Sequence, residues 1–162
     1  MTEILQDGTL FLLLRLILLP VLLLPVCVTD VRRRTIGNRR CIALGGSGLV
    51  LMAAEAISSR PDGGSSLFSA AGGLLAAGVL GGLCRLVSRE GFGLGDVKLI
   101  LALGVFQGLD LFLRSMALTG LLTLAAALYL LLVRRAERTE TLPLAPFLTA
   151  GAILATLWAL LL

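Results

Sequence analysis

The chain has 162 residues, of which 57% are hydrophobic and only 15% are charged, and its formal net charge is +4 at pH 7. Soluble domains average about 45–50% apolar and about 25% charged residues, so this composition excludes an ordinary soluble domain and indicates an integral membrane protein. The chain contains no histidine, which excludes a Ser-His or Cys-His nucleophile pair and an H-E-x-x-H zinc site. A hydrolase of this composition would need carboxylates for its acid–base chemistry.

The hydrophobic residues gather in long stretches. A transmembrane helix needs about 20 predominantly apolar residues, and the sequence predicts six spans, at 9–29, 41–57, 67–87, 91–113, 115–133 and 142–162. The segments between these spans are too short to hold a second domain. We therefore expect an all-α polytopic membrane protein with six transmembrane helices and one membrane-embedded domain over residues 1–162.

One charged residue lies inside the first predicted span. Arg15 precedes Asp30 by 15 residues, which corresponds to roughly 22 Å of helix. Charged residues within a membrane usually pair with one another. Glu55, near the same end of the second span, is the predicted partner of Arg15 in a structural salt bridge.

Glycines inside the spans predict close contacts between helices. Gly78 and Gly82 are four residues apart, as are Gly104 and Gly108. This spacing places two small residues on one helix face, where a second helix can approach closely. Packing within one bundle is the expected use of these glycines, although the same spacing also serves dimerisation.

The basic residues are distributed unevenly over the predicted loops. With six spans the loops alternate between the two sides of the membrane, and eleven of the fourteen Lys and Arg residues fall on one side. Cytoplasmic loops carry an excess of Lys and Arg, so we expect this side in the cytoplasm and both termini outside. Most of the arginines are predicted to set topology and to contact anionic lipid. Nucleic acid is not an expected partner, because no soluble domain is predicted to bind it. The eleven are Arg32, Arg33, Arg34, Arg39, Arg40, Arg85, Arg89, Lys98, Arg134, Arg135 and Arg138.

The segment GFGLGDVKLI, residues 91–100, places an acid near the start of the fourth span. Gly91, Gly93 and Gly95 precede Asp96, and glycines at this spacing permit a tight backbone and the close approach of another chain. One interpretation of Asp96 is structural, because an aspartate in the first turn of a helix is stabilised by the helix dipole and can cap the N-terminus. The other is functional, because ionisable residues at membrane depth mark functional sites.

A second aspartate favours the functional interpretation. Asp30 ends the first span, and the predicted topology places it in the same leaflet as Asp96 and at a similar depth. Two carboxylates close together share one proton near neutral pH. One can then act as general base on a water molecule while the other protonates a substrate carbonyl, as in aspartic proteases. Topology makes this pairing feasible without establishing contact between the two residues.

Three segments resemble motifs of the prepilin peptidases, also called type IV leader peptidases, which are membrane aspartic proteases with a G-x-G-D motif. Residues 93–98, GLGDVK, match the extended GxGDxK pattern. Residues 30–38, DVRRRTIGN, resemble the family's first motif, an aspartate and a basic stretch followed by Ile-Pro-Asn, with Gly37 in place of the proline. Residues 142–154, LPLAPFLTAGAIL, are similar to the segment that opens the family's last helix. The resemblance covers nearly the whole chain.

This resemblance implies a function and a set of site residues. The family cleaves the leader of prepilins and pseudopilins at the cytoplasmic membrane face, before a hydrophobic N-terminal helix of the substrate. By motif position Asp30 and Asp96 are the expected catalytic pair, and no metal or cofactor is expected. Lys98 either sets the electrostatics beside Asp96 or extends its ammonium group to the membrane surface. The expected supporting residues are Gly93, Gly95, Lys98 and Asn38.

The resemblance also bears on a second activity and on location. Large bacterial members of the family carry an extra cytoplasmic domain with paired cysteines and add an N-methyltransferase activity. This chain has no such insertion and no Cys-x-x-Cys pair, so it looks like the short, single-domain form and is expected to act without methyl transfer. The expected partners are a prepilin or pseudopilin-like substrate and the lipid bilayer of the inner (cytoplasmic) membrane. Both a monomer and a homodimer are compatible with the sequence.

Other interpretations of the same aspartates remain open at this point. Other GxGD intramembrane proteases, of the presenilin or signal-peptide-peptidase kind, share the motif but use more spans and have a tyrosine where this chain has Thr29. A small proton-coupled transporter would use Asp30 and Asp96 as relay groups and would need a polar path through the spans. A catalytically inactive assembly scaffold is the third alternative.

Overall fold

The computed structural model describes residues 2–33, 36–58, 63–88, 93–132 and 143–162. Helices account for nearly all of these residues, and no strand occurs among them. The helices are α1 (Thr2–Arg33), α2 (Asn38–Ser58), α3 (Gly63–Ser88), α4 (Leu94–Gln107), α5 (Leu109–Leu132) and α6 (Leu144–Leu161). The predicted span limits at 91, 133 and 142, and the loop basic residues Arg34, Arg89, Arg134, Arg135 and Arg138, lie outside the described residues.

Five of the six helices, all except α4, are long and apolar enough to cross a membrane. The predicted all-α polytopic membrane fold is therefore confirmed. Helix α4 has only 14 residues, which corresponds to about 21 Å, less than the hydrocarbon thickness of about 30 Å. The fourth segment thus differs from the full span that its sequence predicts.

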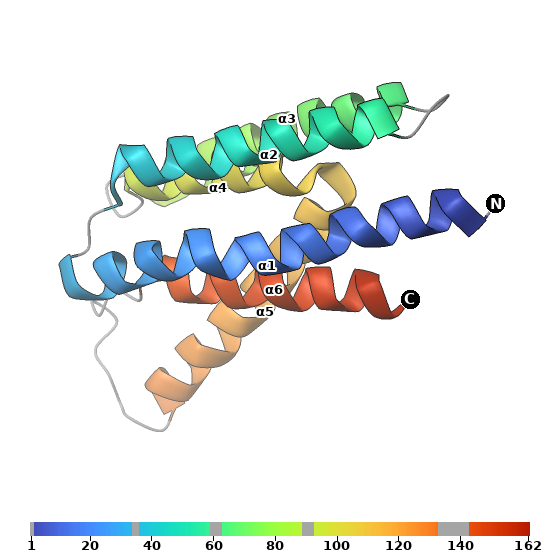
Figure 1. The fold of residues 1–162 in the computed structure, drawn as a ribbon. Coiled ribbons are helices and arrows are strands. Elements are labelled where there is room, and N and C mark those ends of the chain that lie inside the picture. The colour runs from blue at the N-terminus through green and yellow to red at the C-terminus, as the bar shows by residue number, and fades with distance from the viewer. Residues whose placement is uncertain (1, 34–35, 59–62, 89–92, 133–142) are drawn as a thin grey trace.

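The helices form two groups that lie side by side (Figure 1). Helix α4 packs against α2 and α3, and α6 packs against α1 and α5. Both chain termini lie at one end of the bundle. The opposite end holds the last turn of α1 and the first turns of α2, α4 and α6, and we call it the motif end because the three sequence motifs lie there.

Side chains of α1 and α4 fill the core between the two groups. Leu19 and Leu23 of α1 are completely buried, as are Leu99, Leu103 and Phe106 of α4. All five belong to one continuous hydrophobic cluster. One core therefore includes side chains of both helices that carry the aspartates, Asp30 in the last turn of α1 and Asp96 in the first turn of α4.

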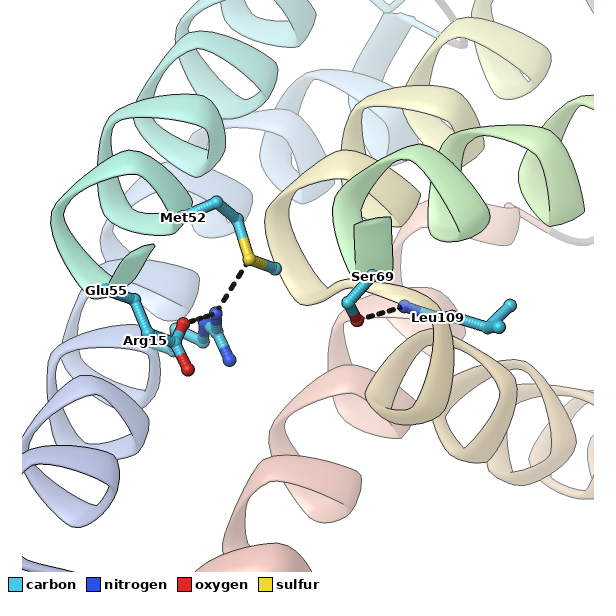
Figure 2. A network of polar contacts seen from close by, with 5 residues as sticks. All are labelled: Arg15, Met52, Glu55, Ser69 and Leu109. Atoms are coloured by element: carbon cyan, nitrogen blue, oxygen red, sulfur yellow. Dashed lines mark hydrogen bonds and ion pairs between the residues drawn. The ribbon is translucent and has the colours of Figure 1, made fainter. Parts of the chain in front are cut away.

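The boundary between α4 and α5 lies at Gly108, and the predicted boundary between residues 113 and 115 is wrong. Gly108 has a φ of 74° and a ψ of 176°, a combination that is essentially restricted to glycine. The backbone N–H of Leu109, freed by this break, donates to Ser69 Oγ of α3 at 3.1 Å (Figure 2). A side-chain acceptor on a neighbouring helix thus replaces the carbonyl that a continuous helix would supply.

The predicted Arg15–Glu55 salt bridge is confirmed. Arg15 Nη2 lies 2.6 Å from Glu55 Oε2, and the two side chains are 8% and 22% exposed. The same nitrogen contacts Met52 Sδ at 3.1 Å (Figure 2). The pair joins α1 to α2 away from the motif end, and therefore connects the two helix groups on the side opposite the aspartates.

Candidate active site

Asp30 lies in the last turn of α1 and is held against the start of α6. Its side chain is buried, at 7% exposure, and its Oδ2 accepts a hydrogen bond of 3.1 Å from the backbone N–H of Ala145. Pro143 occupies the N-cap position of α6 and supplies no side-chain acceptor. A carboxylate from another helix thus satisfies an N–H group that the start of a helix leaves without an intrahelical partner.

Asp96 lies in the first turn of α4, after the extended residue Gly93. Its backbone N–H donates to the carbonyl of Gly93 at 3.1 Å, and its side chain is half-buried. A Cβ atom placed on Gly93 would lie 3.4 Å from Asp96 Oδ2. The glycine therefore leaves the carboxylate next to bare backbone, on the side where a larger residue would crowd it.

The two carboxylates belong to separate motifs. They are 66 positions apart in the sequence and on different helices, yet both lie in turns at the motif end of the bundle. Among the hydrogen bonds of the described residues, none joins the two side chains directly. The arrangement places two acids at one end of the bundle, Asp30 against α6 and Asp96 more open.

The first two motifs pack against each other at this end. A Cβ atom on Gly95 would lie only 3.1 Å from Cβ of Ile36, so the absence of a side chain at Gly95 lets Ile36 lie on the first turn of α4. Beside this contact, Lys98 Nζ donates to Oδ1 of Asn38, the first residue of α2, at 3.0 Å. The structure thus brings all the sequence-predicted site residues to the motif end.

Arg40 is a site residue that the sequence analysis counted only as a topology signal. Its Nη1 donates to the carbonyl of Pro25 at 2.6 Å and to Thr29 Oγ1. Thr29 directly precedes Asp30, so Arg40 joins the start of α2 to the turn of α1 that carries the acid. The distance in sequence concealed this contact, and the only available signal was the position of Arg40 soon after the first motif.

A second contact joins α1 to α6 next to the aspartate. Cys27 Sγ and Thr149 Oγ1 lie 2.9 Å apart, one helical turn from Asp30 and Ala145 respectively. Together with the Asp30–Ala145 hydrogen bond, this contact aligns the two helices over successive turns. The third motif, which opens α6, therefore positions Asp30 through its backbone.

The chemistry available at this end is that of carboxylates, an ammonium and a guanidinium group. In the part of the chain that the structure describes, no group of three or more His, Cys, Asp or Glu side chains is placed to hold a metal ion. Two acids at one site can divide acid and base roles between them. The arrangement can therefore activate a water molecule and protonate a carbonyl or an amine.

Comparisons with known proteins show the family of the chain. Residues 17–160 match the family model described as the type IV leader peptidase family. A prepilin leader peptidase/N-methyltransferase of Pseudomonas putida is 34% identical over 77 residues, which are 47% of this chain and 27% of that protein. One of the same name from Pseudomonas aeruginosa is 32% identical over 94 residues, which are 57% of this chain and 32% of that protein. The matched segments thus span less than a third of either relative. No solved structure matches the chain.

Proposed function

Since this chain belongs to the type IV leader peptidase family, we propose that it is a membrane aspartic endopeptidase that removes the leader of a prepilin or pseudopilin-like substrate. The observation that carries the proposal is the position of the two aspartates at the motif end, Asp30 in the last turn of α1 and Asp96 in the first turn of α4. The substrate keeps its hydrophobic N-terminal helix in the bilayer while its leader reaches the two acids.

The proposed reaction is acid–base catalysed hydrolysis of one peptide bond. One carboxylate accepts a proton from water as the water oxygen bonds to the scissile carbonyl carbon, and the other, protonated carboxyl group donates its proton to the carbonyl oxygen. The C–N bond of this tetrahedral intermediate then breaks. The leaving amine takes the proton that the first carboxylate had accepted from water, and one hydroxyl group of the intermediate returns its proton to the other carboxylate as the new carboxyl group forms.

Neighbouring residues fit positioning roles in this proposal. The Ala145 N–H fixes one oxygen of Asp30, so the other oxygen is available for proton transfer. Gly93 and Gly95 leave room for backbone beside Asp96. The Lys98–Asn38 hydrogen bond ties the start of α4 to the start of α2, and Lys98 adds a positive charge two residues from Asp96.

We also propose the orientation and location that the basic residues favour. Arg32, Arg33, Arg39 and Arg40 flank the motif end in the described part of the chain. The excess of positive charge on this side places it in the cytoplasm, so the site would face the cytoplasm from the inner membrane. Because the chain lacks an inserted domain with paired cysteines, we propose peptidase activity without methyl transfer.

The test is cleavage of a defined substrate by the purified protein. The chain is reconstituted in vesicles with a candidate prepilin from the same genome, and mass spectrometry identifies both products. The expected result is one cut directly before the substrate's hydrophobic helix, by wild type and by Asp110→Asn, whose side chain is exposed and paired with Arg114. A cut inside the hydrophobic helix would instead favour an intramembrane protease of another kind. No cleavage of any candidate would count against the peptidase assignment.

A further inference from the structure

A groove of about 410 Å³ lies between α2, α3 and α4. Its walls are mostly apolar, and its polar residues are at the motif end of the bundle. Helix α3 contributes Leu74 at the deeper end. The groove residues from α2 are Asn38, Cys41, Ile42 and Gly45, and those from α4 are Lys98, Leu101, Ala102 and Val105.

The groove is distinct from the pair of aspartates. Lys98, Leu101 and Val105 follow one another at helical spacing and form one face of α4. Asp96 lies two residues before Lys98, and at 3.6 residues per turn this places the two side chains about 200° apart around the helix. The acid therefore points away from the face of α4 that lines the groove.

The mouth of the groove carries an unneutralised positive charge. Lys98 is exposed, and its ammonium group donates to the neutral amide oxygen of Asn38 at 3.0 Å. In the described part of the chain the ion pairs are Arg15–Glu55 and Arg114–Asp110, so no described carboxylate pairs with Lys98. An ammonium group has three N–H donors, and the hydrogen bond to Asn38 uses one of them.

We propose that this groove binds one anionic phospholipid, with the phosphate on Lys98 and an acyl chain against Leu101 and Val105. This inference rests on the proposed orientation, with Lys98 on the cytoplasmic side, where basic pockets between transmembrane helices are suited to anionic headgroups. An acyl chain buries the apolar walls below. The bound lipid would fill the gap between α2 and α4 and stabilise the helix that carries Asp96.

The dimensions favour a lipid over a transmembrane helix. From Lys98 to Val105 the groove follows α4 for seven residues, or about 10 Å, whereas a spanning helix would need a contact surface along much of the ~30 Å hydrocarbon core. A flexible acyl chain can enter a short groove and leave the rest of its length in the bilayer. A helix from another chain would also need an acid at the depth of Lys98.

The first test measures which lipid remains bound to the purified protein. The chain is saturated with phosphatidylglycerol or phosphatidylcholine in mild detergent, and native mass spectrometry counts the retained lipid. We expect at least tenfold higher retention of phosphatidylglycerol by wild type, and loss of that preference in Lys98→Gln. Leu101→Trp, which fills the groove, should lose both lipids, and Arg39→Gln, which removes an exposed charge from the same end, should behave as wild type. A dimer in place of lipid adducts would contradict the proposal, as would equal retention of both lipids or an equal loss in Arg39→Gln.

A second measurement leaves Lys98 unchanged and so does not depend on how that variant folds. Ile42 lines the groove and is 72% exposed, so Ile42→Trp in a Trp158→Phe background places the only tryptophan there. Vesicles then contain a fixed fraction of lipid with brominated chains, carried on either phosphatidylglycerol or phosphatidylcholine. Stronger quenching by brominated phosphatidylglycerol is expected. Equal quenching by the two lipids would overturn the proposal.

Discussion

The Arg15–Glu55 salt bridge gives a quantitative prediction about what holds the two helix groups together. Its N–O distance is 2.6 Å and its side chains are 8% and 22% exposed, so each charge is largely removed from water. At an effective dielectric constant of about 20, two unit charges some 4 Å apart attract by about 4 kcal/mol. Removing one partner of a buried pair leaves the other charge unpaired and costs about 3–5 kcal/mol, whereas replacing both with apolar residues is often nearly neutral.

We therefore expect Arg15→Met and Glu55→Leu each to lower the free energy of unfolding by about 3 kcal/mol, and the double variant to lower it by about 1 kcal/mol or less. Arg15→Met should cost less than Glu55→Leu, because the Glu55 side chain that it leaves unpaired is the more exposed of the two. The assay is reversible unfolding in mixed micelles as the denaturing detergent is increased, followed by circular dichroism.

A matched control is available on α5. Arg114 and Asp110 also form a salt bridge, of 2.8 Å, but their side chains are 44% and 77% exposed. Exposed pairs contribute at most about 1 kcal/mol, so Arg114→Met and Asp110→Leu should show little coupling. The reasoning is refuted if the Arg15 and Glu55 effects are additive within about 0.5 kcal/mol, as expected for independent sites.

Further variants test the helix break, the α6 cap, the motif contact and the second activity. Gly108→Ala should lower the free energy of unfolding by about 1–3 kcal/mol because of its backbone conformation, whereas Gly120→Ala, in open space on α5, should be neutral or stabilising; equal effects in the two would contradict the proposed strain. Asp30→Ala should destabilise by about 0.5–2 kcal/mol more than Asp30→Asn, because only asparagine can still accept the N–H at the start of α6; equal stabilities would show that this hydrogen bond contributes nothing. The valine side chain of Gly95→Val should overlap Ile36 and lower kcat for prepilin cleavage even where the variant is still folded. An unchanged kcat would show that Gly95 is not part of the site. Incubation with a labelled methyl donor and cleaved pilin should leave the new N-terminus unlabelled, and label on it would refute the absence of methyl transfer.

The sequence predicted the features that depend on local composition and on charge in the membrane. Apolar stretches predicted six full spans, and five of the helices are long and apolar enough to cross a membrane, because length and hydropathy reflect the bilayer directly. The exception is α4, which has 14 residues. Arg15 and Glu55 could be paired before the structure was known, since a charge at membrane depth has few alternatives. Topology predicted that Asp30 and Asp96 lie at the same membrane face, and the structure has both at the motif end, while their action as a pair stays a prediction.

Features set by tertiary contacts could not be read from the sequence. The break at Gly108 involves Ser69 of α3, which accepts the freed N–H of Leu109, and residue type does not reveal this contact with another helix. Of the glycines predicted to allow close packing, Gly104 does so, because a Cβ atom there would overlap the backbone of Gly73. Gly82 does not, since nothing lies within 4 Å of its Cβ position.

The candidate site shows the same difference between features set by residue type and features set by tertiary contacts. The motif residues themselves were predicted, but their contacts were not. The hydrogen bond from Ala145 to Asp30 joins residues 115 positions apart. Its donor is a backbone N–H group, which almost every residue type has, so the sequence could not indicate it. In the sequence Arg40 looks like the other arginines of the predicted loops. Only its hydrogen bonds to Pro25 and Thr29 distinguish it.

The central claim is that Asp30 and Asp96 act as one acid–base pair on a peptide bond. The most direct test is the rate of prepilin cleavage in vesicles by wild type, Asp30→Asn, Asp96→Asn and the double variant, with equal amounts of folded protein confirmed by circular dichroism. Asparagine keeps the size and much of the hydrogen bonding but cannot transfer the proton. We expect each single variant to lose about 10²–10⁴-fold in rate and the double variant to lose little more, because the two acids work together. Cleavage at the wild-type rate by either folded single variant would contradict the claim.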